Sequence, residues 1–169
     1  MKNVVLIGFM GSGKTSVARC LAKKLRLNLY EMDMIIENEA RLTINAIFEK
    51  YGEDYFRNRE SDVLRRVLDN GNEAGIISCG GGVVMREENI RIMKEYGIVF
   101  FLEASEETIY MRLKNSTDRP LLNNNMTTES IEKRLNARLP LYKNAADFMV
   151  NTDSLTVNQV ADEIIRILY

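Results

Sequence analysis

Histidine is absent from the 169 residues of the chain, and cysteine and proline occur only twice each. Without histidine, metal sites with mixed His and Cys ligands and nucleophilic catalysis by a Cys–His pair are excluded. A general base, if the chemistry needs one, must be a carboxylate, a lysine, a tyrosine or a cysteine. The two cysteines, Cys20 and Cys79, lie far apart in the sequence, and we expect two small buried thiols in a reducing compartment.

An excess of charge of either sign is missing as well. Lysine and arginine total 23 against 24 aspartate and glutamate, a net charge of -1, so the overall charge does not attract the protein to nucleic acid or to an anionic membrane. The apolar run Val4–Ile7 is too short for a signal peptide, and no run approaches the length of a membrane span. We therefore expect a cytoplasmic protein that has neither nucleic acid nor a membrane as a partner.

The composition that remains is that of an ordinary globular protein, with 46% hydrophobic and 28% charged residues. A chain of this length is expected to form a single domain over residues 1–169, and a monomer is the default. Short apolar runs alternate with longer segments of helical periodicity, which predicts an α/β fold around a parallel sheet. The predicted strands are residues 3–8, 28–32, 74–78, 98–102 and 147–150. The predicted helices are residues 14–26, 34–50, 53–69, 87–96, 105–114, 128–144 and 156–168, with a break near residues 41–43 as an alternative within the second.

One segment, "NSTDRPLLNNNMT" at residues 115–127, fits neither a helix nor a strand. Its content of asparagine, serine, aspartate and proline is typical of a loop. Loops of about a dozen residues are more often functional lids than plain connections. We therefore expect a mobile lid over about residues 113–127.

The segment "GFMGSGKT", residues 8–15, matches the phosphate-binding pattern G-x-x-x-x-G-K-[ST] at every fixed position. It lies between a predicted strand and a predicted helix, which is the context the pattern requires. Its backbone N–H groups would bind phosphate, Lys14 would reach the β- and γ-phosphates, and the hydroxyl of Thr15 would ligate Mg²⁺. The residues expected to bind the nucleotide here are Gly11, Ser12, Gly13, Lys14, Thr15 and Ser16. A glycine-rich turn that only caps a helix is the structural alternative, and a GTPase, an ATPase and a small-molecule kinase all remain open.

Candidate residues for binding the phosphate acceptor follow the second predicted strand, since parallel sheets bind ligands beyond the carboxyl ends of their strands. Glu31 and Asp33 are two apart on what is predicted to be an extended segment, so both carboxylates are expected to face the phosphate-binding loop. They could orient water molecules on Mg²⁺ or accept a proton from an acceptor hydroxyl. For Asp33, the alternative is an N-cap of the following helix.

Three arginines and a second glycine run complete the candidates. Arg57 lies three residues before Glu60 on a predicted helix, where a solvated ion pair is the alternative. Arg138 lies near a predicted helix end, where it could simply complement the helix dipole. Arg119, in the predicted lid, could neutralise charge on a transferring phosphoryl group. The run "GGG" at residues 80–82 follows the third strand and would let backbone approach the acceptor, unless it is only a tight turn.

Taken together, the sequence resembles the shikimate kinases over nearly its whole length. The resemblance rests on "GFMGSGKT", on Asp33 followed by "MIIE", and on "FRNRE", "SCGGGVV", "RPLL" and "RLPLYKNAAD". It implies transfer of the γ-phosphoryl group of ATP to the 3-hydroxyl of shikimate. The implied fold is a three-layer P-loop fold, like that of nucleoside monophosphate kinases, with a five-stranded parallel sheet in the order 2-3-1-4-5.

The resemblance also implies roles for single residues. Asp33 would bind the hydroxyls of shikimate and act as a base, and Lys14 and Arg119 would stabilise the transferring phosphate. The substrate carboxylate would be held by Arg57 and Arg138, with Gly80, Gly81 and Gly82 lining the same pocket. Arg112 matches a position that stacks on adenine, and about residues 33–61 match the substrate-binding segment. Glu31 departs from the family pattern, which has aspartate there, and this puts an outer contact to the waters of Mg²⁺ in doubt.

Two other functions remain to be distinguished. A P-loop kinase for gluconate or for a nucleoside monophosphate is the nearer one, although Arg57 and Arg138 favour an acceptor that carries a carboxylate. A binding module that has lost catalysis is the other. Four groups that catalysis needs are intact, whereas a decayed site would be expected to lose at least one of them: Lys14, Thr15, Asp33 and Arg119.

Overall fold

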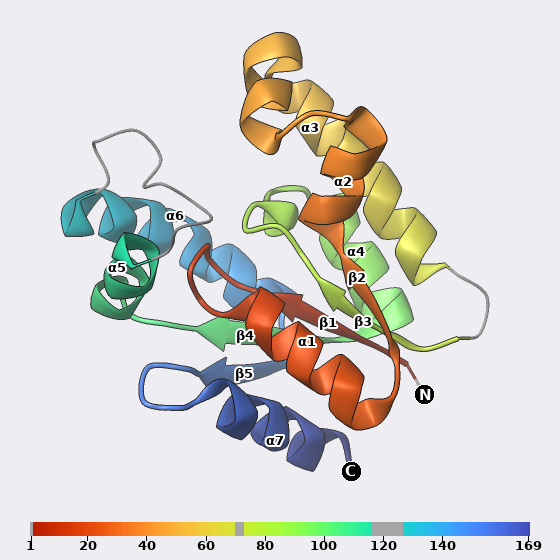
Figure 1. Cartoon of the computed structure of the whole chain (residues 1–169), viewed down its shortest axis with the longest axis vertical. Coiled ribbons are helices and arrows are strands. Elements are labelled where there is room, and N and C mark those ends of the chain that lie inside the picture. Colours follow the sequence, from red (N-terminus) through yellow and green to blue (C-terminus); the bar gives the residue numbers. More distant parts are fainter. Residues whose placement is uncertain (1, 70–72, 116–126) are drawn as a thin grey trace.

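The computed structural model describes residues 2–69, 73–115 and 127–169, and it forms a three-layer α/β structure (Figure 1). The five strands make one parallel sheet in the order β2-β3-β1-β4-β5, which confirms the predicted order. The elements are β1 (Asn3–Ile7), α1 (Lys14–Leu25), β2 (Asn28–Glu31), α2 (Met32–Ala40), α3 (Ile44–Leu68), β3 (Gly75–Ser78), the 3₁₀ turn η1 (Val83–Met85), α4 (Glu87–Tyr96), β4 (Gly97–Glu103), α5 (Glu106–Lys114), α6 (Thr128–Ala145), β5 (Phe148–Asn151) and α7 (Val157–Leu168). Most of the predicted lid lies outside the described residues.

The central strand β1 is buried on both faces and divides the core into two parts. Val5 and Ile7 belong to a core that also takes in side chains of α3, α4 and α6. Val4 and Leu6 face the opposite way, into a core closed by α1 and α7. This alternation follows from the period of two in a strand, and it explains why β1 is apolar throughout. Within the described residues, no helix has the length and apolarity that a membrane span requires.

The segment after β2 departs from the predicted helices. The prediction of one helix over residues 34–50 is wrong, and the alternative break near residues 41–43 is confirmed. Arg41 takes a left-handed conformation with φ 53°, which ends α2, and the hydroxyl of Thr43 caps α3 by accepting a hydrogen bond from the N–H of Ala46. Within α3, Gly52 is non-helical (φ 82°), so the helix bends there. In Figure 1, α2 and the first part of α3 project beyond the sheet.

Both cysteines are free thiols, as expected, but only Cys79 is buried. Cys20 is half-buried in α1 and its Sγ donates a hydrogen bond to Oδ1 of Asn158, 3.2 Å away. The expectation that both thiols are buried was therefore wrong for Cys20. Its side chain lies at the border between α1 and α7, where the two helices pack together.

A single buried asparagine joins the amino end of the sheet to the helices on one face. The side chain of Asn3 donates to the carbonyl oxygens of Leu68 and Tyr96, at 3.3 and 3.0 Å, and accepts a hydrogen bond from the N–H of Gly75 at 2.9 Å. These bonds satisfy the last residue of α3, the end of α4 and the start of β3. Asn3 thus fixes three chain ends around the first residue of β1.

Replacing Asn3 by alanine should destabilise the fold. Three hydrogen bonds disappear at a buried position, and the free energy of unfolding should fall by about 2 to 4 kcal/mol. Urea unfolding followed by circular dichroism measures this. The matched control is Asn28→Ala, because the amide of Asn28 makes an exposed 3.4 Å bond to Glu73, and its loss should cost less than about 0.5 kcal/mol. Equal losses in the two variants would contradict the role of Asn3.

Candidate active site

The loop between β1 and α1 is shaped to bind an anion. Gly8, Gly11 and Gly13 all have positive φ angles, of 151°, 79° and 98°, which other residues rarely adopt. Gly13 is the N-cap of α1, and among the described residues no side chain bonds to the first N–H groups of that helix. The first turn of α1 also carries no acidic residue. The start of α1 thus directs the positive end of its helix dipole at the loop without a side-chain cap, which favours the P-loop interpretation over a simple capping turn.

Lys14 is folded back over this loop. Its Nζ donates to the carbonyl oxygens of Gly8 and Phe9, at 2.7 and 2.9 Å, and the residue is buried. The ammonium group is therefore held at the mouth of the loop, where the phosphates of a nucleotide would lie. Thr15 and Ser16 are exposed in the first turn of α1, so their hydroxyls are accessible beside the same loop.

The two carboxylates after β2 do not share a face, which corrects the prediction. β2 ends at Glu31, and Asp33 already lies in the first turn of α2, so the period-two argument for an extended segment fails. Glu31 accepts two hydrogen bonds from Arg19 of α1, at 2.7 and 3.1 Å. Asp33 instead lies over Gly80, with its Oδ1 only 2.9 Å from where a β-carbon of that residue would be. The N-cap of α2 is Glu31, so the capping alternative for Asp33 is also wrong.

Arg57 and Glu60 form a buried ion pair on α3. Nη1 of Arg57 lies 2.7 Å from Oε2 of Glu60, and the two side chains are 11% and 1% exposed. The guanidinium group also lies 5.2 Å from the centre of the Phe56 ring and makes weaker 3.4 Å contacts with Glu53. The alternative of a solvated pair is therefore wrong. A guanidinium group fixed on several sides keeps its geometry before a ligand arrives.

Arg138 extends from α6 toward the same place. Its Nη1 donates to the carbonyl oxygen of Gly81 at 3.4 Å, and its guanidinium carbon lies 5.7 Å from the centre of the Phe9 ring. The hydroxyl of Tyr142, one turn further along α6, donates to the same carbonyl. Burial raises the pKa of Tyr142 to about 12, so the phenol stays protonated and keeps donating. The partner of Arg138 is thus the second glycine run and not the end of its own helix.

The second glycine run is needed because charged side chains lie directly on it. None of Gly80, Gly81 and Gly82 has a left-handed conformation. A β-carbon on Gly80 would lie 2.7 Å from Oε1 of Glu60, and one on Gly82 would lie 2.4 Å from both terminal nitrogens of Arg57. At Gly81 the closest atom is the backbone nitrogen of Met10, at 3.4 Å, so the two glycine loops are neighbours. The turn alternative is partly true as well, since η1 begins at once with a bond from Val83 N to Gly80 O.

The adenine side of the predicted site is formed by α5 and the turn after β5. Arg112, in the last turn of α5, donates through Nη1 to the carbonyl oxygen of Gly11 at 3.3 Å. The same guanidinium group bonds to the hydroxyl and the carbonyl oxygen of Thr152, at 3.1 and 2.8 Å. Arg112 therefore lies beside the P-loop, and its predicted stacking on adenine stays a prediction.

The structure thus gathers most of the predicted residues at one edge of the sheet. Lys14, Asp33, Arg57, Arg138 and the run 80–82 come from five different segments. Arg119, the predicted lid residue, lies outside the described residues. Glu60 was predicted only as the helix-face partner of Arg57, and Tyr142 was not predicted as a site residue. The i, i+3 spacing from Arg57 gave a signal for Glu60, but the 61-residue separation from Gly81 left none for Tyr142.

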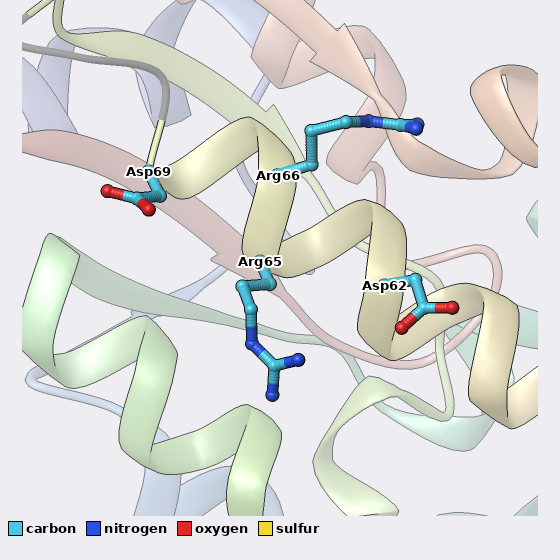
Figure 2. Close-up of a pocket in the computed structure, with 4 residues that line it drawn as sticks. All are labelled: Asp62, Arg65, Arg66 and Asp69. Atoms are coloured by element: carbon cyan, nitrogen blue, oxygen red, sulfur yellow. The ribbon is translucent and has the colours of Figure 1, made fainter.

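A cavity of about 410 Å³ lies elsewhere, on the outer side of α3. It is lined by Asp62, Arg65, Arg66 and Asp69, and Figure 2 shows Arg65 and Arg66 pointing away from each other on two sides of the helix. It contains none of the predicted site residues. Its acidic and basic side chains are mixed on one helix, which does not favour a ligand of either charge, so the glycine loops remain the candidate site.

Comparison with known proteins identifies the family of the chain. The family model of shikimate kinase matches residues 10–169. A shikimate kinase of Thermodesulfovibrio yellowstonii is 44% identical over 166 residues, which are 98% of this chain and 94% of that protein. One of Caldicellulosiruptor saccharolyticus is 46% identical over 167 residues, covering 99% and 95%.

Solved structures show the same similarity. The shikimate kinase of Acinetobacter baumannii, determined in complex with shikimate, has a TM-score of 0.91 and 33% identity, covering 99% of this chain and 93% of that one. A gluconokinase of Sinorhizobium meliloti has a TM-score of 0.61 and 15% identity, covering 98% and 90%. At that identity the second similarity shows the fold alone.

Glu60 is a buried carboxylate of the site, and its surroundings raise its pKa. Burial raises the pKa of Glu60 above its ordinary value of 4.5, the nearby Asp33 adds to the rise, and Arg57 and Arg138 oppose it. Its Oε1 accepts no hydrogen bond from any described residue. The folded protein therefore binds a proton at Glu60 more tightly than the unfolded chain does.

The stability that protonated Glu60 gives should be lost as the pH rises. It is fully present below pH 4.5 and disappears as the pH passes through the raised pKa of the folded state. The free energy of unfolding of the wild type, minus that of Glu60→Gln, should therefore fall as the pH rises above the ordinary pKa of 4.5. Urea unfolding at several pH values measures the difference. A difference that rises with pH would show that the attraction of Arg57 outweighs burial.

Proposed function

This chain belongs to the shikimate kinase family, and we propose that it transfers the γ-phosphoryl group of ATP to the 3-hydroxyl of shikimate, giving shikimate 3-phosphate and ADP. The observation that carries the proposal is the pair Arg57 and Arg138, which lie against Gly82 and Gly81 beside the P-loop. Two guanidinium groups of different helices, both next to bare backbone, suit a planar carboxylate. The acceptor is therefore a small acid rather than a nucleotide.

The acid would be held before the reaction begins. Arg57 would bind the carboxylate of shikimate with the donors that its bond to Glu60 leaves, and Arg138 would bind it from the opposite helix. Because Glu60 fixes Arg57 and Gly81 holds Arg138, little side-chain entropy remains to be lost on binding. The absence of β-carbons at Gly80 and Gly82 lets Asp33, Glu60 and Arg57 lie directly on the backbone that would line the pocket.

Asp33 would act on the reacting hydroxyl. As the hydroxyl oxygen of shikimate forms its bond to the γ-phosphorus, the bond from that phosphorus to the bridging oxygen of ADP breaks, and the proton passes to the carboxylate of Asp33. A secondary alcohol is a weak nucleophile, but phosphoryl transfer depends mainly on positioning and charge neutralisation. Asp33 lies over Gly80, beside the acid pocket, which is where such a group is needed.

The phosphate end of the reaction would use Lys14, Thr15 and Arg119. Lys14 would exchange its bonds to the P-loop carbonyls for the phosphates of ATP, and Arg119 would add a second positive charge. Mg²⁺ fits this site because the exposed hydroxyl of Thr15 lies in the first turn of α1, directly after the P-loop, and such ions are held by few protein oxygens together with phosphates. When bound, Mg²⁺ neutralises charge on the phosphate oxygens. Glu31 is engaged by Arg19 and would not be the group that orients its water.

The protein would work as a monomer in the cytoplasm. Two free cysteines fit a reducing compartment, and the five segments that form the site all belong to one chain. Sedimentation at micromolar concentration, with and without ATP and shikimate, measures the oligomeric state directly. A dimer that forms only with ligands would replace this part of the proposal.

The reaction itself is tested by release of ADP with a panel of acceptors. Purified protein with ATP and Mg²⁺ is given shikimate, quinate, gluconate or a nucleoside monophosphate. We expect turnover with shikimate far above the others. Turnover confined to gluconate or to a nucleotide would overturn the proposal, and turnover with none would favour a binding module.

Arg57 and Asp33 should affect different kinetic constants. Arg57→Ala should raise KM for shikimate by about 100-fold with a small change in kcat, because it removes charge-assisted bonds to the carboxylate. Asp33→Asn should lower kcat by about 100-fold or more, because it removes the proton acceptor. Arg57→Lys keeps the positive charge beside Glu60 but removes the guanidinium group, so it distinguishes the effect of charge from that of guanidinium geometry. An unchanged kcat in Asp33→Asn would remove its proposed role.

The three glycines should tolerate a methyl group unequally. Gly82→Ala would push the β-carbon onto Arg57 and Gly80→Ala onto Glu60 and Asp33, whereas Gly81→Ala meets nothing closer than 3.4 Å. We expect KM for shikimate to rise at least about 10-fold in the first two, the equivalent of about 1.4 kcal/mol, and less in the third. KM for ATP should stay within about twofold of the wild type. The largest effect at position 81 would contradict this order.

A further inference from the structure

Thr152 connects three elements that meet at the P-loop. It lies in the turn between β5 and α7 and is 2% exposed. Its N–H donates to the carbonyl oxygen of Glu103, at the end of β4, at 2.8 Å. Its hydroxyl lies 3.1 Å from the same carbonyl oxygen and 3.4 Å from that of Ser12 in the P-loop. Thr152 is therefore a buried residue that links β4, the P-loop and the turn after β5.

The contact with Ser12 bears on how the P-loop presents its donors. A peptide unit is planar and trans, so its N–H points opposite to its carbonyl. When the carbonyl oxygen of Ser12 faces Thr152, the N–H of Gly13 points away from Thr152. The neighbouring N–H, that of Ser12, already donates within the loop to the carbonyl of Phe9 at 3.1 Å. Thr152 therefore helps to fix the orientation of a donor that the loop leaves for an anion.

Thr152 also determines where the cation of Arg112 lies. Two nitrogens of its guanidinium group donate to Thr152: Nη1 to the hydroxyl oxygen at 3.1 Å, and Nη2 to the carbonyl oxygen at 2.8 Å. Nη1 also donates to the carbonyl oxygen of Gly11, at 3.3 Å. Because two bonds to one residue fix the plane of a guanidinium group, the charge is held beside the P-loop.

The turn that carries Thr152 is held in place by its own bonds. The carboxylate of Asp153 accepts a hydrogen bond from the N–H of Ser105 at 2.8 Å, and Asn151 accepts one from the N–H of Asp153 at 2.9 Å. The position of Thr152 is therefore set before any nucleotide binds.

We propose that Thr152 is a positioning residue for the nucleotide, which acts by holding the Ser12–Gly13 peptide and the guanidinium group of Arg112 in the orientation that binds ATP. The proposal rests on the proposed function for the identity of the nucleotide. Thr152 would not itself touch the nucleotide. The expected effect is on nucleotide affinity and not on the acid, since the pocket at Gly80–Gly82 is built from other segments.

Calorimetric titration with ADP and Mg²⁺, and separately with shikimate, tests the proposal. Thr152→Val keeps the shape and removes the hydroxyl, and we expect it to weaken ADP binding by about 3- to 10-fold while shikimate affinity stays within about twofold. Thr152→Ser keeps the hydroxyl and should restore ADP affinity to near that of the wild type. Adding Thr152→Val to Arg112→Lys should weaken binding less than it does in the wild type, because the two residues act together.

Thr156→Val is the matched control, since it removes a hydroxyl from the same turn, at the cap of α7. It should lower the midpoint of thermal unfolding and leave ADP affinity unchanged. Equal weakening of ADP and shikimate binding in Thr152→Val, or an ADP affinity equal to the wild type, would overturn the proposal. The calorimetry does not need turnover, so loss of activity toward shikimate in the wild type would refute the proposed function and not this inference.

Discussion

The parallel pairing of β1 with β3 is the constraint on which the site depends. Leu6 lies opposite Ser78 in this pairing, and the N–H of Cys79 continues it by bonding to the carbonyl of Leu6. Parallel strands end at the same edge of a sheet, so the loops that follow them must emerge side by side. The P-loop and the glycine run 80–82 are neighbours for that reason. A sheet in another order would separate the phosphate donor from its acceptor.

Crowding at this edge explains the second glycine run better than backbone conformation does. The P-loop glycines are required by their positive φ angles, but those of the run 80–82 are required by what lies on them. Carboxylates and guanidinium groups from α2 and α3 take the space that β-carbons would fill. The two glycine loops thus need glycine for different reasons: the P-loop for its backbone conformation, and the run 80–82 for the close approach of side chains.

The sequence was sufficient where the information is local or follows a period. The P-loop, the strand order and the break before Thr43 could all be predicted, the order from the resemblance to a family. The prediction failed for Glu31 and Asp33 because it assumed an extended chain, and one residue of helix changes the direction of every later side chain. Tyr142 and Thr152 could not be found, because their partners lie 61 and 140 residues away.

The buried pair of Arg57 and Glu60 shows what such a site costs the fold. Removing two charges from water is unfavourable, and their attraction offsets it only partly, since Oε1 of Glu60 has no hydrogen bond from a described residue. An apolar pair of the same volume would pack as well and hold the helix as firmly. It could not hold an arginine rigid beside bare backbone, and that rigidity is what a carboxylate ligand requires. The electrostatic penalty is therefore the cost in stability of holding Arg57 rigid where the acid is proposed to bind.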